Sequence, residues 1–89
     1  MAAKQPGKRA LKAQREARRA ELSARLADLL RALGHGASAA AGMLELGRAG
    51  DAAGLREALA KYSGRTEAEL RRQREAEALV LELAGLPEA

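Results

Sequence analysis

The residues best suited to chemistry in this sequence are cations gathered near its N-terminus. Residues 1–20 contain seven Lys or Arg against one carboxylate, Glu16, which is a net charge of +6. Such side chains bind phosphate oxygens by charge and hydrogen bonding, and each contact releases a counterion. We therefore predict that nucleic-acid phosphates are contacted by Lys4, Lys8, Arg9, Lys12, Arg15, Arg18 and Arg19.

The composition of this basic segment narrows the partners it could bind. It has no aromatic residue on which the bases of a single strand could stack. Duplex DNA or structured RNA is therefore the favoured nucleic acid, and an acidic protein surface is the alternative partner. A lipid surface is disfavoured because the segment lacks a bulky apolar face. The plainest interpretation is a solvated charged helix.

His35 is the one histidine, and a glycine on either side predicts an exposed loop position. The run that follows, GMLELG (residues 42–47), is similar to the end of the phospho-accepting hairpin of one group of sensor kinases. That resemblance implies a phosphocarrier histidine. In such hairpins, however, the histidine lies within a helix, and no second residue here would orient His35. We interpret it as a loop residue without a chemical role.

No arrangement typical of catalysis is found. The hydroxyl residues are few, none is paired with a base in a known motif, and Ser38 and Thr66 are better explained as helix caps. There is no cysteine, no GxSxG, no phosphate-binding glycine loop and no cluster with metal-ligand spacing. We expect a non-enzymatic protein without a metal or a cofactor.

The elements that position these residues are predicted to be helices alone. The chain has 23 Ala and 15 Leu but one Val, one Thr and no Ile, which favours helix and argues against a sheet. The predicted fold is all-α, a small bundle of three to four helices. Residues 1–7 are expected to be disordered and residues 8–86 to form a single helical domain.

The first helix is expected from Lys8 to Leu33, ending at Gly34. Its apolar stripe consists of Leu22, Leu26, Leu29, Leu30 and Leu33. Heptad steps backward from this stripe reach Arg19 and Arg15, so the same face becomes cationic. We therefore predict that residues 8–21 project as a basic arm from a core formed by residues 22–86.

Three further helices follow from local signals. One is expected over residues 39–46, and two more begin at an Asp cap and at a Thr-x-x-Glu capping box. The residues that would begin or end them are Ser38, Gly47, Asp51, Gly64, Thr66 and Gly85. Tyr62 is expected on the apolar stripe of the third helix. Carboxylates are expected to pair within their own helix, as in Glu21 with Arg25, Asp28 with Arg31 and Glu67 with Arg71.

The apolar halves of the first and last helices are predicted to overlap only in part. We therefore expect a homo-oligomer or a docked complex, with an interface formed by Leu22, Leu26, Leu29, Leu33, Leu79, Val80 and Leu83. No secretory signal and no run of about 18 apolar residues is present, so we expect a cytoplasmic protein that does not span a membrane.

Overall fold

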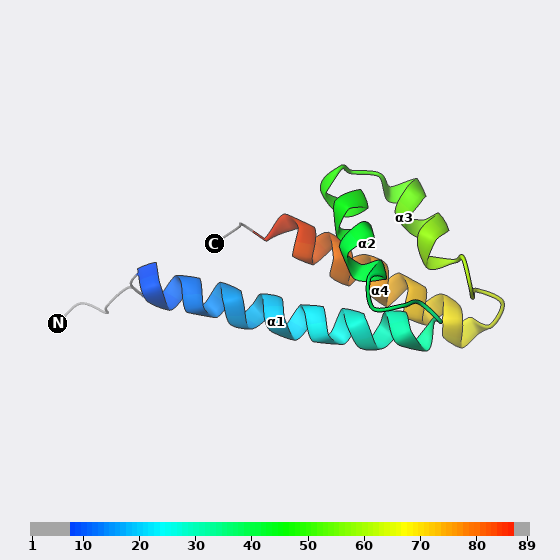
Figure 1. The fold of residues 1–89 in the computed structure, drawn as a ribbon, viewed down its shortest axis with the longest axis horizontal. Helices are drawn as coiled ribbons and strands as arrows, with labels where there is room; N and C mark the ends of the chain where they lie inside the picture. Colours follow the sequence, from blue (N-terminus) through cyan, green and yellow to red (C-terminus); the bar gives the residue numbers. More distant parts are fainter. Residues whose placement is uncertain (1–7, 87–89) are drawn as a thin grey trace.

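The helix-forming composition produces four helices and no strand over residues 8–86, the part of the chain that the computed structural model describes (Figure 1). The helices are α1 (Lys8–Ala32), α2 (Ala39–Arg48), α3 (Ala52–Leu59) and α4 (Glu67–Gly85). They form a compact bundle, as the composition predicted. Within the described residues, no helix is long and apolar enough to cross a membrane.

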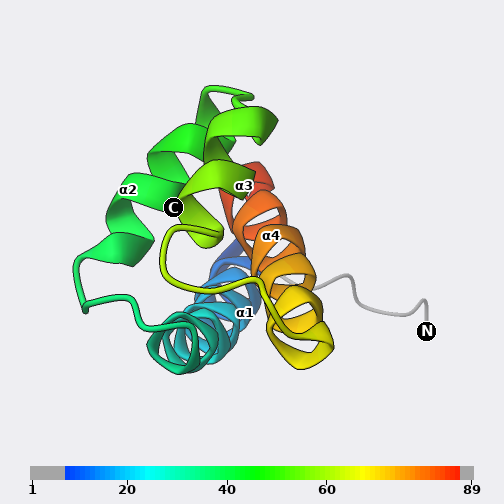
Figure 2. The same cartoon turned by 90° about the vertical axis from the view of Figure 1, so that its right-hand side faces the viewer.

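The two long helices, α1 and α4, lie side by side and run in opposite directions (Figure 1). Two ion pairs join the helices in this antiparallel register, Arg18 with Glu82 and Arg25 with Glu75. The short helices α2 and α3 lie across one side of this pair (Figure 2), and each contacts α4.

All four helices contribute to one apolar core. The largest fully buried side chains are Leu26, Leu33, Leu55, Leu59 and Val80. Burying a leucine contributes about 1.5–3 kcal/mol, so a core made mainly of leucine gives this short chain most of its stability.

The core includes most of the residues predicted as an interface. Of those seven, Leu29 is half-buried and the other six are buried within the chain itself. Helices α2 and α3 cover the apolar surfaces that we expected a partner to cover. A second copy is therefore not needed to bury these leucines.

Several predicted helix ends are confirmed. Gly34, separated from the last residue of α1 by Leu33 alone, has φ +91°, a left-handed conformation that glycine adopts at little cost. Asp51 accepts a hydrogen bond from the backbone N–H of Gly54 and caps α3. Thr66 Oγ1 accepts one from the N–H of Glu69, as the capping box requires. In return, the Glu69 carboxylate accepts bonds from the Thr66 hydroxyl and from the N–H of Gly64.

Three predicted ends are wrong. The Ser38 side chain makes no capping bond, so α2 begins without a side-chain cap. Gly47 lies inside α2, where a Cβ would stand 3.0 Å from Val80 Cγ1, and the left-handed residue is Gly50. Close packing on α4, and not helix termination, therefore explains the glycine at position 47. Helix α3 ends at Leu59, which leaves Tyr62 beyond the helix and 61% exposed.

Candidate nucleic-acid interface

The first turns of α1 contain no core residue. Every residue from Ala10 to Arg18 is exposed, and the first buried side chain of the helix is Leu22. In Figure 1 the blue beginning of α1 lies beyond the red end of α4. With no apolar contact to make there, this segment presents its polar side chains to solvent.

The cations of this segment continue the face that enters the core. Lys12, Arg15 and Arg19 precede Leu22 and Leu26 at helical spacing, so all five lie along one side of α1. The sequence alone predicted this change from apolar to cationic on one face. It follows that the basic face points toward the same side of α1 as the bundle.

The seven predicted phosphate-binding residues have different surroundings. Lys12 and Arg15 are exposed, and among the described residues neither has a carboxylate partner. Arg19 is half-buried and already takes part in an interaction within the chain. Lys8 and Arg9 lie in the first turn of α1, and Lys4, like the predicted disordered segment 1–7, falls outside the described residues. Among the seven predicted residues, Lys12 and Arg15 are thus the described cations best placed to meet a ligand.

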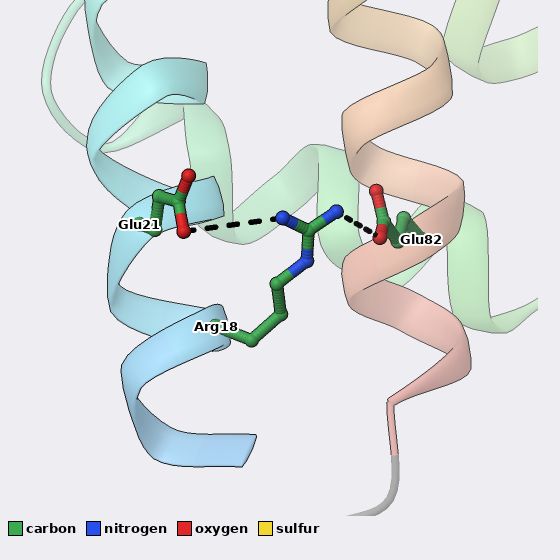
Figure 3. A network of polar contacts seen from close by, with 3 residues as sticks. All are labelled: Arg18, Glu21 and Glu82. Carbon is green, nitrogen blue, oxygen red and sulfur yellow. Dashed lines mark hydrogen bonds and ion pairs between the residues drawn. The ribbon is translucent and has the colours of Figure 1, made fainter. Parts of the chain in front are cut away.

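Arg18 is held by two carboxylates (Figure 3). Its guanidinium donates to Glu82 Oε1 of α4 at 2.7 Å and lies 3.9 Å from Glu21 of its own helix. The hydrogen bond and charge of Glu82, with a smaller contribution from Glu21, raise the pKa of Arg18. Arg18 thus links α1 to α4, and a phosphate would have to compete with Glu82 for it.

The sequence analysis missed the carboxylates of α4 that face other helices. Arg25 binds Glu75 across the helix pair and not Glu21 of its own helix, so that predicted pair is wrong. Glu77 binds Arg56 of α3 at 2.6 Å. Helical spacing reveals pairs within one helix but not pairs between helices.

The other two predicted pairs form as expected. Asp28 lies 3.8 Å from Arg31, and Glu67 lies 3.9 Å from Arg71. Both are exposed pairs in which a carboxylate precedes a cation by one turn. Neither pair includes one of the seven predicted phosphate-binding residues.

His35 is not the exposed loop residue that its glycine neighbours predicted. It is half-buried, and its Nε2 lies 3.3 Å from the carbonyl oxygen of Leu59. Its ring meets that of Tyr62 edge-on, with 5.1 Å between centroids. His35 thus joins the loop after α1 to the end of α3, which is a packing arrangement.

No group of three or more His, Asp or Glu side chains converges as a metal site within residues 8–86. Comparison with protein-family models, with curated proteins and with solved structures finds no match to this chain. The fold of the described residues defines a small bundle of four helices.

Proposed function

We propose that this protein is a non-enzymatic nucleic-acid-binding protein that holds phosphates with the first half of α1. In this proposal residues 8–21 act as a basic arm and the rest of the bundle anchors it. The observation that carries it is the exposure of Lys12 and Arg15 on a segment without core residues.

The physical basis is electrostatic. The first 20 residues carry +6 and residues 21–89 carry −2, which adds to the net +4 of the chain. A positive segment beside an acidic body attracts a polyanion at one place and orients it. Lys12, Arg15 and their basic neighbours would displace the counterions that are condensed on the phosphates, and the release of those counterions favours binding.

The composition of the basic segment favours a duplex or a structured RNA over a flexible single strand. A helix presents cations one turn apart on one face, with about 5–6 Å between Cβ atoms, so several can contact phosphates together. No aromatic side chain lies in residues 1–20 to stack on unpaired bases. The expected binding is therefore independent of sequence and sensitive to salt.

The test is fluorescence-anisotropy binding to a random-sequence DNA duplex and to an RNA hairpin across a range of salt. We expect a linear loss of log affinity with log salt concentration. Lys12→Gln with Arg15→Gln should weaken binding and reduce the slope by about two, because each phosphate contact contributes about 0.9.

The matched control is Arg48→Gln with Arg65→Gln, which removes the same charge from exposed positions outside α1. The control should leave the salt slope unchanged. Equal effects of the two double variants would show that net charge, and not the α1 segment, determines affinity.

The competing function is a protein adaptor whose basic helix docks on an acidic surface, with no nucleic acid involved. In that case the same exposed cations, Lys12 and Arg15, would bind carboxylates of the partner protein. This function is favoured if the full chain binds neither nucleic acid at physiological salt. The binding experiment therefore separates the two proposals.

A further inference from the structure

The outer face of α4 carries two exposed leucines. Leu70 is 40% exposed and Leu81 is 47% exposed, although both are large apolar side chains in a well-formed helix. They are eleven residues apart, which is three helical turns, so they lie on the same face. At about 100° per residue that face lies opposite the core residue Leu79 and borders α3 on one side.

Between these leucines the same face carries one cation and one anion. Arg74 and Glu77 complete the spacing Leu70, Arg74, Glu77, Leu81, which are steps of four, three and four. This is the spacing of a helix that packs lengthwise on another helix. Within the described residues Arg74 is exposed and has no carboxylate partner, whereas Glu77 lies at the border with α3, where Arg56 holds it and 20% of its side chain is exposed.

A hollow adjoins this face. It lies between α3 and α4, has a volume of about 510 Å³, and is lined by Leu59, Leu70, Arg74 and Glu77 among others. An apolar side chain that entered it would contact leucine while lying beside three charged groups, Arg56, Arg74 and Glu77. A partner must therefore present both an apolar group and matching charges.

We propose that the partner is a second copy of this chain, packed through α4 against α4 in antiparallel orientation about a two-fold axis. The axis passes between Arg74 and Glu77, so that Leu70 meets the partner's Leu81. On the same register Arg74 meets the partner's Glu77, and Glu77 meets the partner's Arg74. A two-fold interface needs a surface that is complementary to itself, and this face of α4 meets that condition.

Charge decides the orientation. In a parallel pair Arg74 would face the partner's Arg74 and Glu77 would face the partner's Glu77, which repel each other. In the antiparallel pair both contacts join opposite charges, and Glu77 lies between Arg56 and the partner's Arg74. The leucine of the partner would approach the hollow beside Leu70.

This interface is independent of the nucleic-acid proposal. Arg18 lies beside Glu82, near the C-terminal end of α4. The basic segment of α1 is therefore close to that end of α4. An antiparallel pair of α4 helices places the two basic segments at opposite ends of the dimer. Dimer formation can then be measured without nucleic acid.

The first experiment is sedimentation equilibrium of the full chain, with loading concentrations from about 10 µM to about 1 mM, because a single helix pair gives a small and weak interface. We expect a reversible monomer–dimer equilibrium. A monomer throughout this range would overturn the proposal.

Charge reversal tests the register. Arg74→Glu and Glu77→Arg should each weaken self-association by about tenfold or more, because each places like charges across the axis. A mixture of the two variants restores both opposite-charge contacts and should form a heterodimer. Circular dichroism checks that each variant keeps its helices.

The matched control is Arg48→Glu, the same charge reversal on the exposed end of α2. It should leave self-association unchanged. Association that resists both α4 variants, or that the mixture fails to restore, would show that this face is not the interface.

Orientation is tested by cross-linking, since the chain contains no cysteine. Leu70→Cys mixed with Leu81→Cys should form a disulfide between the two variants under mild oxidation. Either variant alone should form little disulfide-linked dimer. Efficient cross-linking of Leu70→Cys with itself would indicate a parallel pair and contradict the proposal.

Discussion

At the scale of single residues, Arg18 illustrates how a carboxylate can decide which cations meet a ligand. Lys12, Arg15 and Arg18 are all exposed cations of α1. Of the three, only Arg18 binds Glu82 of α4 (Figure 3). The hydrogen bond and charge of Glu82 raise the pKa of Arg18, a guanidinium that is protonated throughout the physiological range in any case. Arg18 is thus a cation of the basic segment that a carboxylate of α4 already binds.

Replacing Glu82 should therefore raise nucleic-acid affinity if the proposed function holds. Glu82→Gln removes the competing charge and frees Arg18, and we expect roughly a two- to tenfold gain at low salt together with a steeper salt slope. The measurement is the same anisotropy titration. Glu45→Gln, at an exposed position of α2, makes the same change in net charge and is the control. Equal gains in both variants would contradict a role for Arg18.

At the scale of helices, α2 and α4 begin in different ways. Thr66 accepts the N–H of Glu69 at 3.1 Å and places α4 after an extended residue. Ser38 has a helix-like backbone conformation, φ −82° and ψ −10°, and its side chain caps nothing. A cap requires its residue to leave the helical region, so the same kind of side chain serves one helix and not the other.

The contrast predicts a difference in stability. Thr66→Ala should lower the free energy of unfolding by about 1 kcal/mol, since it exposes an unsatisfied N–H at the first turn of α4. Ser38→Ala should leave that free energy nearly unchanged. Urea denaturation followed by circular dichroism measures both variants. A loss for Ser38→Ala as large as that for Thr66→Ala would mean that the Ser38 hydroxyl caps α2 in solution.

At the scale of the whole molecule, the stability of the fold rests on a few leucines. Leu55, from the shortest helix, is 0% exposed and joins the cluster that connects α3 to the two long helices. A small domain has a total stability of about 5–15 kcal/mol, so a single cavity in such a core removes a large share.

Leu55→Ala should therefore destabilise the protein by about 2–5 kcal/mol, through lost burial and the cavity left behind. Leu11→Ala should be nearly neutral, because Leu11 is 39% exposed near the beginning of α1. Thermal and urea unfolding of the two variants give the comparison. An equal loss in both would show that the beginning of α1 is packed in solution, against the proposed arm.

The sequence by itself determined the helices and several of their ends. Alanine and leucine, the stripe from Leu22 to Leu33 and the caps at Asp51 and Thr66 act within a few residues, so local rules were sufficient. For the candidate site, local charge sufficed to single out the basic segment, but not Lys12 and Arg15 within it.

The tertiary structure alone decided what each face contacts. Three features depend on residues that are distant in sequence. They are the helices that cover the leucines of α1, the cation that Glu82 binds, and the close packing that explains a glycine at position 47. Helical periodicity specifies the direction in which a side chain points, but not what lies there. Arg18 and Lys12 thus look alike in the sequence, and only the packing of α4 beside α1 separates an occupied cation from an available one.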